Sequence, residues 1–441
     1  MIDATHDPAL TSWVESANDP ATDFPIQNLP FGVFRSQAGA IGMARTGVAI
    51  GDMVLDVAAA LRQGLFQGES NQIARSCGQT LNDLMALGAP AWRALRQRLS
   101  EMLRADTALG DRAAKLATSI LWAQRDVVMQ LPASIGNYSD FYASLAHATN
   151  IGSMLRPDNP LLPNYKWVPI GYHGRASSIV LSGTPVTRPH GQTKADDAAA
   201  PRFGPSALLD YELEVALFTG PGNRLGSPIP IADAGAHLFG LSLLNDWSAR
   251  DIQAWEYQPL GPFLSKSFAT SISPWIVTTD ALSPFRAPAL ARQAGDPQPL
   301  PYLSDARDAA QGAFDVGLEV YLQSRAMRER GLAPQRLSRA SFAGMYWTPA
   351  QLIAHHASNG CNMMPGDVLG SGTVSGAEKD ARGCLLELTW RGSEPVSLAS
   401  GETRRFLEDG DIVTLRGSAE RQGYRRIGFG ECSGEVVAAV V

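Results

Sequence analysis

The sequence predicts a mostly β protein with some α structure, divided into two domains. Its 441 residues exceed what one hydrophobic core usually supports. Short apolar runs broken by glycine and proline dominate the chain after Pro132, whereas the clearest helical periodicity precedes it. We therefore expect an N-terminal domain over residues 1–131, with strands and helices, and a large β-rich domain over residues 132–441.

The N-terminal domain is expected to begin with extended chain. The segment from Asp23 to Phe34 contains two prolines that bar a helix. Two apolar runs then follow, at 47–50 and 53–55, and the dipeptide Gly51-Asp52 between them is typical of a two-residue β-hairpin. These features predict a small β-rich module.

Two helices are predicted between this module and Pro132. The first is indicated by apolar residues that recur at helical spacing, namely Ala91, Trp92, Leu95, Leu99 and Leu103. The second is expected from about Ala113 to Gln130.

The β-rich domain is predicted from short strands. Ser178–Ser182 is one apolar run, and Phe314–Leu322 alternates strictly, as a half-buried strand does. Two irregular stretches, the polar Gly191–Pro205 and the proline-rich Ser283–Gln311, are expected to be surface loops.

Composition narrows the functional class. The chain is 45% hydrophobic and 18% charged with a formal charge of −6, and it has no block of Lys and Arg, so nucleic acid and anionic membranes are not expected as partners. Its first residues lack an apolar signal core and no run approaches a membrane span, which predicts a cytoplasmic protein. Because no C-x-x-C pair occurs, we expect the four thiols to be reduced and buried: Cys77, Cys361, Cys384 and Cys432.

A candidate cation site is centred on a strand predicted at Leu209–Phe218. The two-residue period of a strand places Glu212 and Glu214 on one face. Two carboxylates side by side in so apolar a strand require a cation. Asp246 ends a later apolar run, where a helix would need its N-cap, and is a third candidate carboxylate. The alternative is an exposed acidic strand followed by an ordinary cap.

A carboxylate and an imidazole are predicted to line one wall of this site. If Ser139 or Asp140 starts a helix, His147 lies about two turns later on the face of Asp140. The alternative is a capping aspartate and a packed histidine.

A second wall is predicted on the helix after Asp246. Arg250, Gln253 and Tyr257 have the spacing of one helix face. Trp247, Ile252 and Trp255 indicate that this helix is buried, and a buried arginine needs an anionic partner.

A lone lysine follows this helix. Lys266 is the single charge in the apolar stretch 259–270, so it either reaches water or pairs with the carboxylates. Pairing is the better expectation this close to the carboxylates.

Three further stretches bear on the site. His355 and His356 lie on a predicted helix at 348–360 and point about 100° apart, so they are not expected to share a metal ion. The glycine-rich 370–376 loop could bring N–H groups and the Thr373 hydroxyl to an anionic ligand. Glu387 is the single charge of a predicted apolar strand at 384–390, which indicates that it faces a partner.

Taken together, these motifs resemble the fumarylacetoacetate hydrolase family over nearly the whole chain. The resemblance runs from Asp23-Phe24-Pro25-Ile26-Gln27-Asn28-Leu29-Pro30 through Asp246-Trp247-Ser248-Ala249-Arg250-Asp251-Ile252-Gln253 to Gly428-Phe429-Gly430-Glu431-Cys432. It implies an SH3-like N-terminal β-barrel, a C-terminal mixed β-sandwich roll and a homodimer. It also implies metal-dependent hydrolysis of a carbon–carbon bond in fumarylacetoacetate, the last step of tyrosine and phenylalanine catabolism.

The resemblance implies a role for each candidate residue. The implied calcium ligands are Asp140, Glu212, Glu214 and Asp246, with a second cation, magnesium, near Asp246 and the main chain of Lys266 and Thr270. His147 resembles the general base and Glu387 the residue that orients it, while Arg250, Gln253 and Lys266 would stabilise an oxyanion. The implied substrate contacts are Tyr142, Arg156, Tyr172, Gln253, Tyr257 and Thr373.

The chain departs from the family pattern at Met363-Met364, where an arginine is expected, and in the proline-rich insertion. Two alternatives remain open at this point. One is a related superfamily activity, acylpyruvate hydrolysis or decarboxylation of another diketo acid, on the same carboxylate site. The other is a non-catalytic, calcium-stabilised dimer that binds a dicarboxylate.

Overall fold

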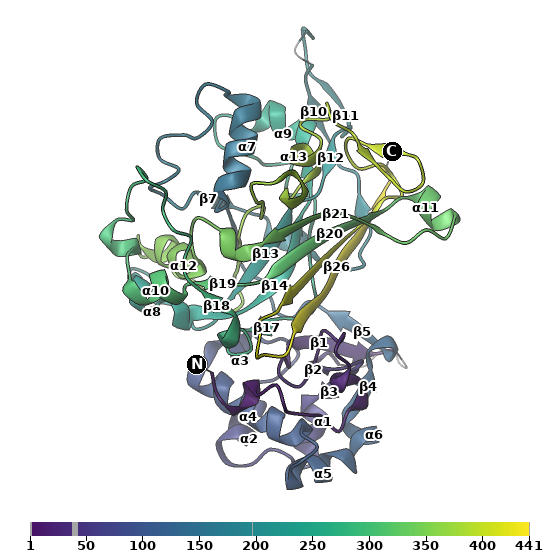
Figure 1. The fold of residues 1–441 in the computed structure, drawn as a ribbon, viewed down its shortest axis with the longest axis vertical. Helices are drawn as coiled ribbons and strands as arrows, with labels where there is room; N and C mark the ends of the chain where they lie inside the picture. Colours follow the sequence, from purple (N-terminus) through teal and green to yellow (C-terminus); the bar gives the residue numbers. More distant parts are fainter. Residues whose placement is uncertain (1, 38–42, 196, 441) are drawn as a thin grey trace.

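The computed structural model describes residues 2–37, 43–195 and 197–440 and shows a mixed α/β structure with many strands. The N-terminal part lies below the rest of the molecule in Figure 1. Its sheet has the order β4-β3-β2-β1-β5 (Leu121–Ala123, Met53–Asp56, Arg45–Ile50, Phe31–Ser36, Val127–Gln130). Its helices are α1 Val57–Arg62, α2 Gly68–Ala74, α3 Asn82–Ala86, α4 Ala89–Leu103, α5 Ala108–Ala114 and α6 Ala117–Ile120.

The predicted hairpin and first helix are confirmed. Ile50 and Met53 are register partners in β2 and β3, and Gly51 has the positive φ that the turn requires. The predicted helix at 113–130 is wrong beyond Ile120. Leu121–Ala123 pairs with β3 and Val127–Gln130 with β1, so tertiary pairing overrides the local helical preference.

A large sheet forms the centre of the molecule. Its order is β7-β6-β22-β13-β14-β16-β8 (Gly171–His173, Tyr138–Phe141, Val368–Gly370, Leu213–Thr219, Leu238–Asp246, Thr270–Ile272, Ile179–Leu181), and β17 (Val277–Thr278) also pairs with β14. A second sheet has the order β21-β20-β25-β26-β9 (Gln335–Ser341, Gly317–Gln323, Ile412–Ala419, Ile427–Val437, Val186–Thr187). The alternating burial of β20 confirms most of the half-buried strand predicted at Phe314–Leu322, but Phe314 belongs to the separate strand β19.

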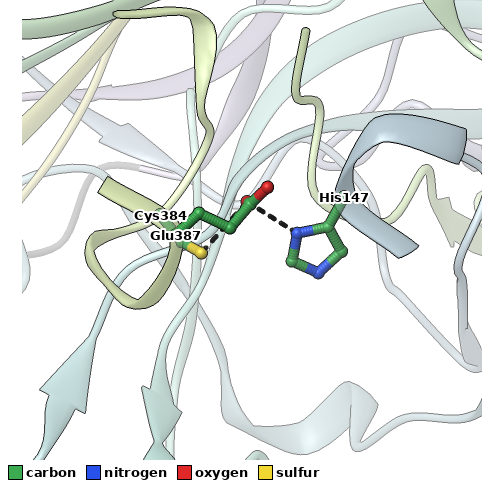
Figure 2. A group of neighbouring side chains, drawn as sticks. All are labelled: His147, Cys384 and Glu387. Carbon is green, nitrogen blue, oxygen red and sulfur yellow. Dashed lines mark hydrogen bonds and ion pairs between the residues drawn. The ribbon is translucent and has the colours of Figure 1, made fainter. Parts of the chain in front are cut away.

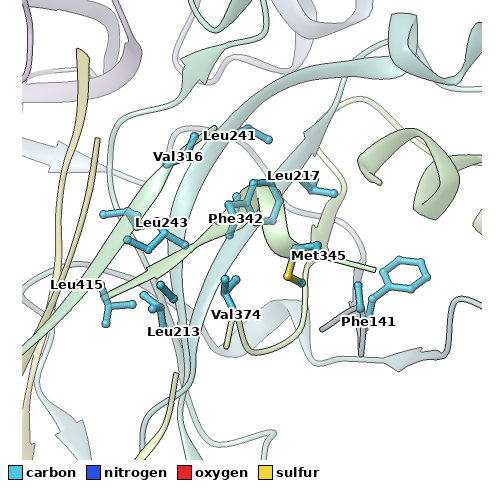
Figure 3. Close-up of a cluster of buried hydrophobic side chains, with 14 of the residues drawn as sticks. Phe141, Leu213, Leu217, Leu241, Leu243, Val316, Phe342, Met345, Val374 and Leu415 are labelled. Atoms are coloured by element: carbon cyan, nitrogen blue, oxygen red, sulfur yellow. The ribbon is translucent and has the colours of Figure 1, made fainter. Parts of the chain in front are cut away.

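Hydrophobic residues cover both faces of the large sheet. Leu213, Val215 and Leu217 of β13 point into the core shared with the second sheet, part of which Figure 3 shows. Ala216 and Phe218 alternate with them and pack in the core of the N-terminal part. Because alternate side chains of a strand share a face, Glu212 and Glu214 lie on the same face as Ala216 and Phe218. The N-terminal part covers this face at Ala216 and Phe218.

The remaining helices and short strands surround these sheets. The helices are α7 Leu145–Leu155, α8 Ile231–Ala234, α9 Arg250–Glu256, α10 Ala306–Gln311, α11 Arg325–Glu329, α12 Pro349–Ala357 and α13 Leu385–Leu388. The paired short strands are β10 His190–Thr193 with β11 Arg202–Pro205, β12 Leu209–Asp210 with β15 Ser248–Ala249, β18 Arg286–Ala287 with β19 Ala313–Phe314, and β23 Val396–Ser397 with β24 Thr403–Arg404.

Both predicted surface loops contain regular structure. The two ends of the 191–205 stretch pair as the strands β10 and β11, and Asp196 lies outside the described residues. The proline-rich stretch contains β18 and α10, and its Arg292 lies 3.8 Å from the ring centroid of Tyr346. Part of this stretch therefore packs against the rest of the protein.

Two further predictions are corrected. Residues 385–388 form the short helix α13 instead of a strand, with Asp210 accepting hydrogen bonds from the first N–H groups. Trp255 is 44% exposed, although α9 is buried at Arg250 and Ile252.

The four cysteines are free as expected, and all but Cys361 are buried. No described helix has the length and apolar character that a membrane span requires.

Candidate active site

The predicted carboxylates meet on the large sheet, where they come from β6, β13, β14 and the residue just before β13. Asp140, Glu212, Glu214 and Asp246 are buried, and one ligand oxygen of each lies within 4.8 Å of the others. Asp140 is in β6 and Asp246 is the last residue of β14, so Asp140 does not start a helix and Asp246 is not the helix N-cap that the sequence predicted. Their strand positions follow from pairing: Gly370 of β22 is the register partner of both Asp140 and Ala216 of β13.

Gly370 provides the space in which these carboxylates meet. A Cβ at this position would lie 2.6 Å from Asp140 Oδ1, 3.0 Å from Glu214 Oε2 and 3.0 Å from the Tyr138 hydroxyl. Only a residue without a side chain leaves these oxygens room to converge across β22.

The charges in this carboxylate cluster are compensated unevenly. The Lys266 ammonium donates to Glu212 Oε2 at 2.5 Å and to Asp246 Oδ2 at 2.7 Å, as predicted for this lysine. Arg250 Nη1 donates to Glu212 Oε1 at 2.8 Å. Within the described parts of the chain, Asp140 Oδ1 and Glu214 Oε1 are buried without a hydrogen-bond partner.

The pKa shifts follow this division. Burial opposes the charge of Glu212, but Lys266, Arg250 and His147 outweigh burial and hold its pKa well below the ordinary value. Burial and the charge of Asp246 raise the pKa of Asp140 to about 8. Burial and Asp140 likewise raise the pKa of Glu214. Asp140 and Glu214 therefore require a further cation if both are to be ionised at neutral pH.

This donor set fits a hard divalent cation. Carboxylate oxygens are the ligands that calcium and magnesium prefer, and the two buried oxygens without a partner are free to coordinate. Thr270 of β16 donates to Asp246 Oδ1 at 2.9 Å, and the Tyr172 hydroxyl lies 3.3 Å from Asp246 Oδ2. Thr270, predicted near the second cation, and Tyr172, predicted as a substrate contact, thus both contact the cluster through Asp246.

A histidine–carboxylate pair, drawn in Figure 2, lies close enough to the cluster for His147 to act on the charge of Glu212. His147 Nδ1 is 2.7 Å from Glu387 Oε2, and both residues are buried. His147 is in the first turn of α7, where its N–H donates to the capping Ser144 hydroxyl. The predicted helix from Asp140 is therefore wrong, because α7 begins only after Ser144.

Glu387 is held by more partners than His147 alone. Asn150 donates to Oε1 at 2.8 Å, whereas Ser375 at 2.8 Å and the Cys384 thiol at 3.2 Å donate to Oε2. Burial opposes its charge, but His147 and these bonds lower its pKa to about 2. An ionised carboxylate only accepts hydrogen bonds, so Nδ1 of His147 carries a proton, and in the neutral imidazole Nε2 has the lone pair.

The residues that hold Glu387 were not predicted from the sequence. Asn150 could have been found, because it lies three positions after His147 on one helix face. Ser375 and Cys384 carried no pattern of their own. Cys384, His147 and Glu387 are close enough together to be potential metal ligands. The Cys384 thiol and the His147 ring N–H, however, both donate to the same oxygen of Glu387, so hydrogen bonds already account for this cluster.

The helix α9 contributes the predicted polar face. Arg250 Nη1 also donates to Gln253 Oε1 at 3.1 Å, and Tyr257 ends this helix. Among the residues that the structure describes, the buried Arg250 Nη2 has no hydrogen-bond partner. A buried guanidinium nitrogen with no acceptor is available to a ligand.

Three other predicted ligand contacts are Tyr142, Arg156 and Thr373. The Tyr142 ring meets that of His147 edge on, with centroids 5.3 Å apart. Arg156 is the C-cap of α7, and its Nη2 donates to the Pro160 carbonyl at 3.3 Å. Thr373 Oγ1 and Arg156 Nε are buried and have no hydrogen-bond partner among the described residues 2–37, 43–195 and 197–440. The predicted histidine pair is separated as expected, since His355 contacts Tyr302 and His356 contacts Ser139.

A carboxylate cluster suited to a hard cation, beside an imidazole oriented by a carboxylate, is the combination expected of a metal-dependent hydrolytic enzyme. Sequence comparison gives the particular family. The family described as "Fumarylacetoacetase N-terminal" matches residues 27–132, and "Fumarylacetoacetate (FAA) hydrolase C-terminal" matches residues 137–437. The chain belongs to the fumarylacetoacetate hydrolase family.

Curated relatives match at nearly full length. Fumarylacetoacetase of Caenorhabditis elegans is 50% identical, covering 95% of this chain and 97% of the relative. The human and bovine fumarylacetoacetases are 47% and 48% identical, covering 98% and 97% of this chain and 99% of each relative. Among solved structures, fumarylacetoacetate hydrolase from Exiguobacterium antarcticum aligns with a TM-score of 0.49 at 18% identity, over 93% of this chain and 99% of that one.

Proposed function

We propose that this protein is a metal-dependent hydrolase that cleaves fumarylacetoacetate to fumarate and acetoacetate, the last step of tyrosine and phenylalanine catabolism. The observation that carries this proposal is the His147–Glu387 pair buried beside the carboxylate cluster. The full-length similarity to curated fumarylacetoacetases supports the choice of substrate.

The reaction sets the chemical requirements. A carbon–carbon bond between two carbonyl groups breaks hydrolytically when hydroxide adds to one carbonyl. The bonding electron pair then leaves on carbon as the enolate of the other carbonyl and is protonated to give acetoacetate. The enzyme must therefore deprotonate water, stabilise the oxyanion of the adduct and stabilise the enolate.

His147 is proposed as the general base that deprotonates water. Glu387 holds the Nδ1–H, which leaves Nε2 to accept the proton. The ionised Glu387 also stabilises the imidazolium that results. General-base catalysis of this kind contributes roughly 10²–10⁴-fold to rate.

Asp140, Glu212, Glu214 and Asp246 are proposed to hold a calcium ion. When bound, calcium supplies Lewis-acid polarisation of the two substrate carbonyl oxygens, which favours the enolate leaving group. A second cation, proposed to be magnesium, would be held near Asp246 with main-chain groups of Lys266 and Thr270. The uncompensated carboxylates Asp140 and Glu214 support a divalent charge at this position.

Three donors are proposed to stabilise the oxyanion. Arg250 offers Nη2, Gln253 keeps its amide N–H groups because Oε1 accepts from Arg250, and Lys266 has a third N–H beyond its two carboxylate partners. Loss of one such donor typically costs about 10²–10³-fold in kcat.

The substrate's carboxylates and carbonyls need further contacts. Arg156 is proposed to bind a carboxylate through charge-assisted hydrogen bonds. Tyr142, Tyr172, Tyr257, Gln253 and Thr373 are proposed to complete the binding site, and the unpaired Thr373 hydroxyl supports this assignment.

We also propose the finer architecture that the resemblance implies. Residues 1–131 would form an SH3-like β-barrel domain and residues 132–441 a mixed β-sandwich roll. Two copies would form a cytoplasmic homodimer, and the four free cysteines are consistent with a reducing compartment. Light scattering of the purified protein tests the homodimer.

The proposed activity is tested by incubating the protein and calcium with fumarylacetoacetate. Loss of the diketone absorbance with stoichiometric fumarate and acetoacetate is expected, and a chelator should abolish it. Turnover of an acylpyruvate or another diketo acid in its place would favour a related superfamily activity. Binding of a dicarboxylate without turnover would indicate a non-catalytic protein.

A further inference from the structure

Asp210 connects two parts of the active site without belonging to the carboxylate cluster. It is the last residue of β12 and is fully buried. Its Oδ1 accepts from the N–H groups of Tyr211 at 2.9 Å and Leu385 at 2.8 Å. Its Oδ2 accepts from the Leu386 N–H at 3.0 Å and from Arg250 Nε at 2.9 Å. One carboxylate thus binds α13 and Arg250 at the same time.

The bonds to α13 fix the start of the helix that carries Glu387. Cys384, the N-cap residue, makes no capping bond through its side chain. Asp210 instead accepts from the first two N–H groups of the helix, which a cap residue would otherwise satisfy. Because Glu387 follows by one residue, Asp210 sets the position from which Glu387 reaches His147 Nδ1.

The bond to Arg250 fixes the plane of the guanidinium. Nε donates to Asp210, whereas Nη1 donates to Glu212 and Gln253. Because the guanidinium is planar and rigid, fixing two of its nitrogens also fixes the direction in which the third points. The direction of Nη2, the nitrogen without a partner in the described chain, therefore depends on Asp210.

We propose that Asp210 is a positioning residue that fixes the position of Arg250 relative to the Glu387–His147 pair. This inference rests on the proposed function, in which His147 is the general base and Arg250 donates a hydrogen bond to the oxyanion. Asp210 acts through its neighbours, since its two oxygens are fully occupied by Arg250 and backbone N–H groups.

The test compares Asp210→Asn with the matched control Asp251→Asn. Asp251 is the next residue after Arg250 in α9 and also binds a distant segment, with the Ser206 hydroxyl at 2.6 Å and the Ala207 N–H at 2.7 Å. In the described part of the chain its carboxylate accepts from Ser206, Ala207 and Ile252, none of which is a predicted site residue. In Asp210→Asn, an amide N–H group must face either Arg250 Nε–H or the α13 N–H groups, so one of these connections is lost.

Asp210→Asn is expected to lower kcat about 10–100-fold, the usual effect of removing a group that orients an active-site ligand. KM should stay within about threefold and calcium binding, measured by calorimetry, should persist, because the substrate and metal contacts remain. Asp251→Asn should keep the wild-type kcat. Equal kcat values for the two variants would overturn the inference.

Coupling to Glu387 is tested in a double-mutant cycle. If Asp210 acts through Glu387, then Asp210→Asn should cost less in a Glu387→Gln background than in wild type, whereas full additivity would contradict that route. Should Asp210→Asn fail to fold, Asp210→Glu keeps the charge but displaces the carboxylate, and an unchanged kcat in that variant would also overturn the inference. A wild-type protein without hydrolysis would instead refute the proposed function.

Discussion

Asp140 lies opposite Gly370 in the parallel pair β6–β22, and its Oδ1 occupies space that any side chain at 370 would take. A Cβ there would lie 2.6 Å from that oxygen. This relationship explains how carboxylates from non-neighbouring strands converge, because the strand between them presents only a hydrogen atom.

Gly370→Ala is therefore expected to weaken calcium binding and turnover together. The added methyl group must displace the Asp140 or Glu214 carboxylate, and a misplacement near 1 Å costs on the order of 10²-fold in activity. Gly204→Ala is the control, since a Cβ at this strand glycine meets nothing within 4 Å. Unchanged calcium affinity in Gly370→Ala, measured by calorimetry, would argue against a metal in this cluster.

His147→Ala should separate catalysis from metal binding. Removal of the base is expected to lower kcat by about 10²–10⁴-fold while calcium still binds, because His147 is not among the four carboxylates. His355→Ala is the control, as this half-buried histidine contacts Tyr302 and lies outside the site. Retained turnover in His147→Ala would exclude it as the base.

Thr373→Val should raise stability and impair substrate binding. The variant removes a buried hydroxyl that has no partner among the described residues, and such a hydroxyl costs about 1–3 kcal/mol. Unfolding in urea should thus require more denaturant, while KM rises by roughly tenfold, the equivalent of one hydrogen bond. A lower stability with unchanged KM would indicate a purely structural threonine.

Calcium should stabilise the protein more at pH 8 than at pH 6. Burial and Asp246 raise the pKa of Asp140 from 3.8 to about 8, so its carboxyl favours folding at low pH and loses that contribution as the pH rises through about 8. Calcium compensates the charge that then appears. At lower pH it must displace a proton, which weakens apparent binding by up to about tenfold per pH unit.

Thermal unfolding of chelator-treated protein, with and without calcium, measures this dependence. The increase in Tm on adding calcium should grow between pH 6 and pH 8. An increase that is equal at both pH values would mean that calcium binding displaces no proton from the cluster.

Sequence patterns singled out the carboxylates that the structure brings together, but not the elements that carry them. Glu212 and Glu214 were found because strand periodicity separates them from the apolar residues of β13. Asp246 precedes a helix within a few residues and therefore resembled a cap, but Ala249 is the N-cap of α9. Its actual place, at the end of β14, depends on pairing with β16, which no local pattern reveals.

The same limit explains Asp210 and the N-terminal strands. The bonds from Asp210 to Leu385 and Leu386 join residues about 175 positions apart, so local spacing could not predict them. Leu121–Ala123 and Val127–Gln130 become strands because β3 and β1 offer unpaired edges. Long-range pairing thus decided what short windows of sequence left ambiguous.

The most direct test of the metal centre is a calcium titration of chelator-treated wild type and Glu214→Gln by calorimetry. Glu214 is the informative position, because Oε1 is buried without a partner in the described residues and its substitution leaves the Lys266 contacts intact. The carboxylate cluster predicts saturable calcium binding by the wild type that is lost or strongly weakened in Glu214→Gln. Equal binding by both proteins would contradict it.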